Sequence, residues 1–208
     1  MRDYGPYDRR QALAGTSYVL VTAPVIEPIS LEEAKLHARI TDVNSDGLLM
    51  SYVQAAREEA EAALGFGLLT QTWRYDLSFW SDVIPLPMAR DLQSIVSVKY
   101  YDGDGTLQTL SSSFYSTDTA ARPTALVRAS NTAWPTLQAD RNTGRIQITY
   151  MVGWTAPAFV PERIKQGIRL WVTFLDLNRD GLEDADRAMG AAMQCWTDRM
   201  YYVEPSCA

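Results

Sequence analysis

The sequence has little of what covalent cross-linking or membrane insertion requires. Its two cysteines, Cys195 and Cys207, lie in the last fourteen positions, so a bridge between them would close only a short terminal loop. We expect both thiols to stay reduced, as in a cytoplasmic protein. The N-terminus lacks the apolar core of a signal peptide, and no run of about eighteen apolar residues could span a bilayer. The sequence therefore predicts a protein that is neither exported nor embedded in a membrane.

Catalytic signatures are also scarce. The single histidine, His37, falls in a short predicted helix beside Lys35 and Arg39. We expect it to be an exposed helix residue, because a general base needs a positioned partner. The chain has no P-loop, GxGxxG, HExxH or CxxC motif. These observations predict a protein that is not an enzyme and that needs no cofactor.

The net charge of −6 is unevenly distributed along the chain. Residues 30–64 carry seven acidic and three basic residues, and residues 176–208 repeat that count. Residues 65–175 hold eight acidic and ten basic residues. An acidic chain of this kind does not bind the phosphate backbone through counterion release, so we expect no sequence-specific binding of nucleic acid.

Two helices are predicted before residue 65. Ser30 and Glu33 have the spacing of a capping box, which predicts a helix over about 31–40. Apolar residues at helical spacing predict a second helix over about 46–64, and Gly65 suits its left-handed cap. The predicted buried stripe consists of Leu48, Leu49, Tyr52, Val53, Ala56, Ala60, Ala63 and Leu64.

Two more helices are predicted near the C-terminus. Pro161 suits the first position of a helix, and the residues that follow repeat at helical spacing. The shared apolar face is formed by Ile164, Ile168, Trp171, Val172 and Leu175. A last helix is expected over about 183–200.

The middle of the chain has the period of two that is typical of strands. In residues 68–80, Leu69, Trp73, Tyr75, Leu77 and Phe79 fall on one face, which predicts a half-buried strand. The turn Asp102-Gly103-Asp104-Gly105 predicts a hairpin between two further strands. Shorter strands are expected at 114–118, 124–128 and 145–150.

This order of elements predicts an α+β fold, a bundle of about four helices with a small antiparallel β unit inserted. Residues 25–67 and 153–200 would form the helical core, and residues 68–152 the inserted β unit. Residues 1–24 would be an N-terminal extension and 201–208 a tail. We expect the helical part to melt cooperatively even when a short Gly/Ser linker replaces the β unit.

A calcium-binding helix-loop-helix protein is one alternative. Residues 42–47 and 176–181 both read DxNxDG, the opening of an EF-hand loop. The twelfth loop position should be Glu, but it is Val53 in the first loop and Arg187 in the second. We therefore expect no metal, with Asp46 capping a helix and Asn178 starting a helix-ending turn. The weak metal candidates would be Asp176, Asn178, Asp180 and Asp184.

From about Val25 to Asn178 the sequence resembles the tailed-phage head–tail connector (adaptor) proteins, including their gene-transfer-agent counterparts. The similar segments are PISLEEAK at 28–35, AAREEA at 55–60, LTQTW at 69–73, IPLP at 84–87, ITYMVGW at 148–154 and the final NRDG. The resemblance implies a dodecameric ring that binds the portal protein, extends the DNA channel and presents a surface to a tail-proximal stopper or tail terminator. It also implies a place at the head–tail junction of the virion after assembly in the host cytoplasm, and it brings no catalytic residues.

Two features of the sequence fit this resemblance but allow other interpretations. Acidic helices lining the channel would repel duplex phosphates and let DNA slide, although they could equally be ordinary solvated faces. The tryptophans of the middle region would suit a carbohydrate- or protein-binding β module, although such residues more often fill a core or a subunit interface. They are Trp73, Trp80, Trp134 and Trp154.

The C-terminus is unusually rich in large apolar groups for a chain end. We expect these residues either to pack back on the helices of the same subunit or to anchor it to the portal. The candidates for the portal interface are Trp196, Met200, Tyr201, Tyr202 and Val203. If they bind the portal, deleting residues 196–208 should abolish docking and leave melting nearly unchanged.

Overall fold

The computed structural model of the chain describes residues 16–179 and 185–196. The chain divides into two units, and each takes segments from two parts of the sequence. The helical unit consists of Val25–Leu69 and the chain from Trp154 onward. The β unit consists of Thr70–Gly153 and the residues before Val25. The predicted α+β class is confirmed. No helix within the described ranges is long and apolar enough to cross a membrane.

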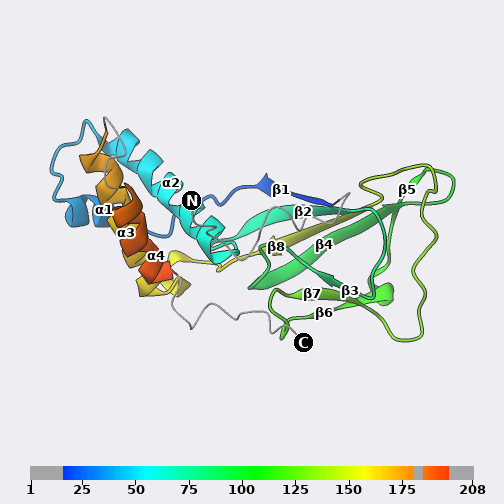
Figure 1. Ribbon diagram of the computed structural model, residues 1–208. Coiled ribbons are helices and arrows are strands. Elements are labelled where there is room, and N and C mark those ends of the chain that lie inside the picture. The colour runs from blue at the N-terminus through cyan, green and yellow to red at the C-terminus, as the bar shows by residue number, and fades with distance from the viewer. Residues whose placement is uncertain (1–15, 180–184, 197–208) are drawn as a thin grey trace. The chain divides into compact units, whose positions relative to one another are not determined.

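The described part of the helical unit has four α-helices, which are labelled in Figure 1. α1 spans Leu31–Ala38 and α2 spans Asp46–Leu64. After the short 3-10 helix η3 (Pro157–Phe159), α3 spans Glu162–Leu177 and α4 spans Ala185–Trp196. α3 contacts the other three helices, so it is the centre of the unit.

Local sequence signals explain where the first two helices begin and end. The capping box at α1 is confirmed, because Ser30 and Glu33 exchange hydrogen bonds between side chain and backbone. Gly65 ends α2 with φ 73°, as its predicted left-handed cap requires. Most of the predicted α2 stripe is buried or half-buried, but Leu48 is 42% exposed.

The core of the helical unit lies where α2, α3 and α4 meet. α3 buries Ile164, Ile168, Trp171 and Val172, as its apolar spacing predicted. Gly167 of α3 leaves room for the indole of Trp196, whose Nε1 donates to the Ile164 carbonyl at 3.3 Å. Further core residues are Ile29, Leu49, Val53, Ala56, Ala60, Leu68, Leu69 and Ala192.

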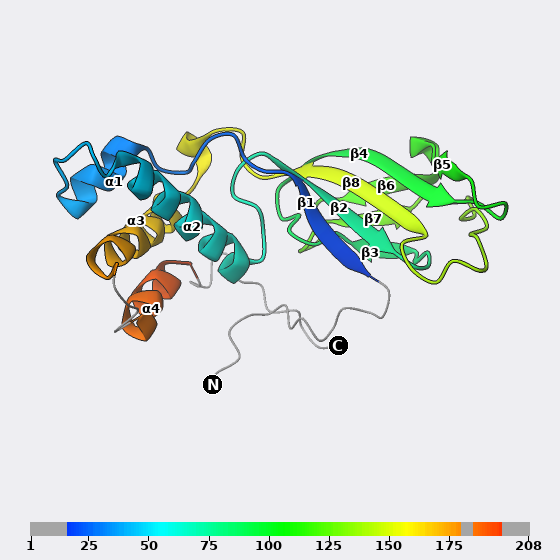
Figure 2. The ribbon, with the colours of Figure 1, turned by 90° about the horizontal axis from the view of Figure 1, so that it is seen from above.

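The β unit has two antiparallel sheets, which Figures 1 and 2 show. The five-stranded sheet has the order β1-β2-β8-β4-β5, and the three-stranded sheet has the order β3-β7-β6. The larger sheet consists of β1 (Ser17–Thr22), β2 (Gln71–Leu77), β8 (Ile146–Val152), β4 (Leu92–Tyr101) and β5 (Leu107–Thr109). The smaller one consists of β3 (Val83–Pro85), β7 (Ala125–Arg128) and β6 (Tyr115–Asp118), and the 3-10 helix η2 (Ser112–Phe114) precedes β6.

Residues of both sheets form a single core in the β unit. Ile146, Ile148 and Tyr150 alternate on the buried face of the central strand β8. They pack with Val98 of β4 and Leu126 of β7. The predicted hairpin between β4 and β5 is confirmed: the Asp102 carboxylate accepts from the amides of Asp104 and Thr106, and Gly105 has φ 79°.

The structure changes three details of the predicted β unit. The N-terminal segment supplies strand β1, which pairs with β2 and which the sequence did not indicate. Leu68 and Leu69 belong to the core of the helical unit, although the sequence assigned them to the β unit. Phe79 lies beyond the end of β2 and is 53% exposed, so the alternating face ends at Leu77.

Candidate interaction surfaces

A buried ionic network holds the segment before α1 against α2. The Arg57 side chain is only 3% exposed, and its Nε lies 2.8 Å from the Glu27 carboxylate. Its Nη1 lies 2.9 Å from Glu61, one helical turn further along α2. Glu61 also accepts from the backbone amide of Leu68 at 2.8 Å. The network therefore connects residues 27, 57, 61 and 68 of the helical unit through charge-assisted hydrogen bonds.

Burial and ion pairing shift the pKa values of these groups in opposite directions. Burial raises the pKa of the Glu27 carboxyl, and the Arg57 guanidinium only partly offsets that effect. Burial lowers the pKa of Arg57, but the neighbouring carboxylates of Glu61 and Glu27 outweigh it and leave that pKa raised. Arg57 thus stays charged, and the two acids depend on it for compensation.

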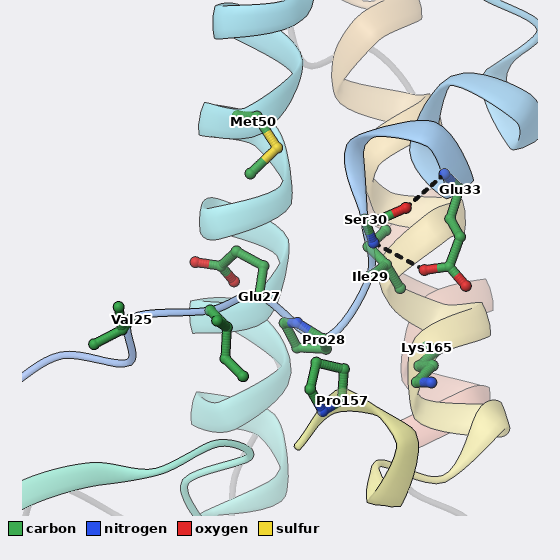
Figure 3. A pocket seen from close by; sticks show the side chains of 10 residues that line it. Val25, Glu27, Pro28, Ile29, Ser30, Glu33, Met50, Pro157 and Lys165 are labelled. Carbon is green, nitrogen blue, oxygen red and sulfur yellow. Dashed lines mark hydrogen bonds between the residues drawn. The ribbon is translucent and has the colours of Figure 1, made fainter. Parts of the chain in front are cut away.

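A groove of about 460 Å³ lies beside this network in the helical unit (Figure 3). Val25 and Pro28 lie on the segment that passes across α2, and Pro157 lies beside Pro28. Val25 is 94% exposed, so the groove opens to solvent beside a large unpacked apolar side chain. Its lining residues are Val25, Ile26, Glu27, Pro28, Ile29, Ser30, Glu33, Met50, Pro157 and Lys165.

The polar groups in this groove have structural partners. The Ser30 hydroxyl accepts from the Glu33 amide at 3.1 Å, and the Glu33 carboxylate accepts from the Ser30 amide at 2.8 Å. Lys165 Nζ lies 3.9 Å from Glu162. The groove thus combines exposed apolar side chains with polar groups that are already bonded within the helical unit.

A second apolar surface is formed by strand β1 of the β unit. All six residues of β1 are exposed, and four of them are large and apolar. Tyr18 contacts Trp73 of β2 with ring centroids 5.6 Å apart, but its outer side is uncovered. The exposed fractions are 49% for Tyr18, 44% for Val19, 38% for Leu20 and 53% for Val21. β1 forms one edge of the larger sheet.

His37 is less exposed than the sequence suggested. It is half-buried, and its Nδ1 lies 2.9 Å from the Thr173 hydroxyl of α3. Burial lowers the pKa of the imidazole, and the nearby Arg169 guanidinium lowers it further. The expectation of an exposed residue was wrong, because α1 packs on α3 through this face.

A lysine of the protein itself binds the first DxNxDG loop. Lys35 Nζ donates to Asp46 at 2.6 Å and to the Asp42 carbonyl at 2.8 Å. The Asp42 carboxylate accepts from the side chains of Asn44 and Ser45. Asp46 was expected to cap α2, but it is the first helical residue, and Ser45 precedes it as a cap without a side-chain bond. This corrects the predicted cap.

The described part of the second loop ends α3. Asn178 is the C-cap, and its side chain donates to the Phe174 carbonyl at 2.9 Å. Asp176 pairs with Arg179 at 2.5 Å. Asp180 and Asp184 lie outside the described residues. Within the described part of the chain, no three His, Cys, Asp or Glu residues gather as a metal site would require.

The tryptophans of the β unit contact neighbouring groups of the same unit. Trp80 and Trp134 stack with centroids 4.4 Å apart. Their indole N–H groups donate to the carbonyls of Pro135 and Ser81, respectively, both at 3.1 Å. In the helical unit, Trp154 packs edge-on against Phe66. The rings of these three tryptophans and the N–H groups of Trp80 and Trp134 are used within the fold, which disfavours the alternative of a carbohydrate-binding module.

The C-terminal candidates divide into two groups. Trp196 is fully buried against α3, so it belongs to the helical core and is not an exposed anchor. This favours, for Trp196, the alternative in which the chain packs on its own helices. Met200, Tyr201, Tyr202 and Val203 lie outside the described residues, as does Cys207. Cys195 has a free, half-buried thiol in α4.

Sequence reasoning missed the two features that best define these surfaces. Arg57, Glu58, Glu59 and Glu61 read as a solvated helix face, yet Arg57 and Glu61 are buried. Arg57 and Glu61 are four residues apart in the sequence, and this spacing could have indicated an ion pair on one face of the helix. The six residues of β1 contain no charge, and their β-branched and aromatic side chains are typical of a strand.

Comparison with known proteins relates part of this α+β chain to a described family. Residues 28–117 match the family described as "Phage gp6-like head-tail connector protein". The match runs from the residues before α1 to β6 and so includes parts of both units. Over these residues, which are less than half of the chain, the sequence is similar to this head–tail connector family.

Solved structures share the fold. A chain from the virion of a native gene transfer agent (GTA) particle is 19% identical, with a TM-score of 0.66. A chain from the neck of an empty GTA particle, computed with C6 symmetry, is 20% identical, with a TM-score of 0.67. A chain from the neck of a native GTA particle, computed with C12 symmetry, is 20% identical, with a TM-score of 0.65. Each comparison covers 86% of this chain and 94% of the other. No curated protein sequence matches the chain.

Proposed function

We propose that the protein is a structural head–tail connector subunit, which forms a ring under the portal, extends the DNA channel and links the capsid to the tail. The observation that carries this proposal is the connector-family match over residues 28–117. The fold shared with chains of GTA particle necks supports it. Its partners are the portal protein on one side and a stopper or tail terminator on the other. The subunit assembles in the host cytoplasm and ends at the head–tail junction of the virion.

The symmetry of the related particles supports a ring, and we propose a dodecamer. GTA necks were computed with C6 and C12 symmetry, and a twelve-membered ring is compatible with both. A ring also needs two different surfaces on each subunit, because neighbours contact each other head to tail. The groove of the helical unit and the exposed strand β1 are apolar surfaces that such contacts would cover.

DNA passes through the ring without sequence-specific binding. The exposed acidic residues of α1 and α2 include Glu32, Glu33, Glu58 and Glu59. Turned toward the channel, these carboxylates would repel the phosphates of duplex DNA and keep it from adhering. We also infer a structural role without catalysis, because His37, Ser30 and Glu33 are used in packing and helix capping.

Electron microscopy of the protein mixed with portal rings from the same particle tests the proposal. We expect an additional ring of density on the tail side of the portal, with twelvefold or sixfold symmetry. Portal rings mixed with an unrelated acidic protein of similar size provide the control. Portal rings that remain bare at saturating protein would refute the proposed function.

A further inference from the structure

The larger sheet of the β unit has two open edges. β1 forms one edge along its full length of six residues. On the opposite side, β5 pairs only with Lys99–Tyr101 of β4. Among the described residues, no strand pairs with the outer side of β4 from Leu92 to Ser97. This leaves an open stretch of six residues in line with β5, the same length as β1.

The sequences of both edges lack two of the features that usually prevent strands from pairing. Natural edge strands are protected by charged residues, especially lysine, and by proline. The β1 sequence SYVLVT and the β4 stretch LQSIVS contain neither. The edges instead expose Val19 and Val21 on β1 and Val96 on β4, the last being 54% exposed.

The smaller sheet does not cover β1. Tyr18 and Leu20 are paired with Tyr75 and Trp73 of β2, so they share the face that packs on the core. A three-stranded sheet lies against the five-stranded one, and Tyr18 and Leu20 remain 49% and 38% exposed. Figure 1 shows β1 at the free edge of the larger sheet, away from β3, β6 and β7. Within the described part of the chain these apolar side chains stay exposed, which is typical of an interaction surface.

Strand direction favours a second copy of this chain as the partner of this surface. Every neighbouring pair in the larger sheet is antiparallel, so β1 and β4 run in opposite directions. When the next copy has the same orientation, its β1 is therefore antiparallel to β4 of the first copy. The sheet then continues from subunit to subunit without a change in pattern, and the head-to-tail contact closes into a ring.

We infer that β1 of each subunit pairs with the open stretch Leu92–Ser97 of β4 in the neighbouring subunit, so that one continuous sheet runs around the ring. This inference rests on the proposed connector function. The register of β4 against β8 shifts between Leu92 and Ser94 and between Ile95 and Ser97. Irregularities of the β-bulge kind increase the local twist of a sheet.

Cross-linking in portal-bound rings tests the contact. Full-length protein with both native cysteines replaced by serine would carry Val19→Cys, Val96→Cys or both. After treatment with a short bis-maleimide, the double variant should form linked chains of two, three and more subunits. An equal mixture of the two single variants should stop at linked dimers, and each single variant alone should stay monomeric. Dimers from Val19→Cys alone would indicate a two-fold contact between β1 strands and overturn the inference.

Edge charges provide a second measurement. Val19→Lys combined with Val21→Lys places two ammonium groups on exposed positions, so the melting temperature should hardly change. Ring occupancy on the portal should fall roughly tenfold or more, because lysine prevents edge pairing. The matched control is Val43→Lys, at a position of the helical unit that is 70% exposed.

The outcomes separate this inference from the proposed function. Two results would overturn the strand contact and leave the connector function intact. One is that the lysine variant forms rings on the portal normally. The other is that the double cysteine variant forms rings but its subunits do not cross-link. A failure of the wild-type protein to form any ring on the portal would overturn both.

Discussion

Adding one methyl group to Gly167 tests the packing of α3 against α4. A Cβ at this position would lie 2.3 Å from Nε1, 2.8 Å from Cδ1 and 2.9 Å from Cε2 of Trp196. The indole is fully buried, and a hydrogen bond to the Ile164 carbonyl holds it. A rigid double ring in this position has no flexible end that could move aside.

Two opposing effects decide whether Gly167→Ala raises or lowers the stability of the protein. Alanine in place of glycine inside a helix stabilises by about 1 kcal/mol. Overpacking a core costs about 1–3 kcal/mol, and expelling a buried tryptophan side chain costs roughly 3–5 kcal/mol. Because the contact distances fall far below van der Waals separation, we expect a net loss of about 2 kcal/mol and a melting temperature lower by roughly 4–8 °C.

Urea denaturation followed by far-UV circular dichroism measures the effect. Gly190→Ala in α4 is the matched control, because nothing lies within 4 Å of its added Cβ, and it should stabilise by about 0.5–1 kcal/mol. In a Trp196→Ala background the clash is absent, so Gly167→Ala should become stabilising there too. If Gly167→Ala raises the stability of the wild-type chain as Gly190→Ala does, the predicted packing of Trp196 over Gly167 is refuted.

Four further predictions follow from other contacts. Arg57→Ala removes the guanidinium that pairs with half-buried Glu27 and buried Glu61, and it should cost about 3 kcal/mol in denaturant titrations, whereas Glu59→Ala at an exposed position should change stability by less than about 0.5 kcal/mol. Equal effects would contradict the network. The pKa of His37 lies below its ordinary value of 6.5, so the unfolded chain takes up the proton first and the stability of the fold falls as pH drops through and below 6.5. His37→Gln should reduce this loss of stability between pH 7.5 and 5.5 in melting scans. An unchanged pH dependence would exclude His37 as its cause. Deleting residues 197–208 should leave the melting temperature nearly unchanged but weaken portal binding. Deletion from Trp196 onward should also destabilise the helical unit by about 3 kcal/mol or more. Equal melting temperatures of the two truncated chains would argue against a core role for Trp196. A chain that starts at Val25, with a Gly/Ser linker in place of Thr70–Gly153, should still melt cooperatively by calorimetry, and a molten product would contradict the independence of the helical unit.

The elements that the sequence predicted well have strong local signals. Ser30 and Glu33 cap α1 as their spacing indicated, and Gly65 ends α2 as expected. The glycine-rich turn after Tyr101 closes its hairpin because Asp102 binds the amides of the turn. In each case the residues that determine the structure are only a few positions apart.

The features that escaped prediction depend on contacts between distant segments. Arg57 is buried because Glu27, thirty residues earlier in the chain, provides its partner. β1 becomes a strand by pairing with β2, which follows some fifty residues later in the sequence, after α1 and α2. The burial of Trp196 depends on the absence of a side chain at Gly167 of another helix. Periodicity within one segment carries no information on such pairs.

The interleaving of the two units determines the order in which they can be completed during synthesis. The described strands of the β unit end at Val152, whereas the core of the helical unit still needs α3 and α4, up to Trp196. A nascent chain that has just exposed Gly153 outside the ribosome can thus form the entire larger sheet, while α1 and α2 still lack the helices that cover their apolar faces. Limited proteolysis of chains arrested at that length should protect the strands and cleave within α2.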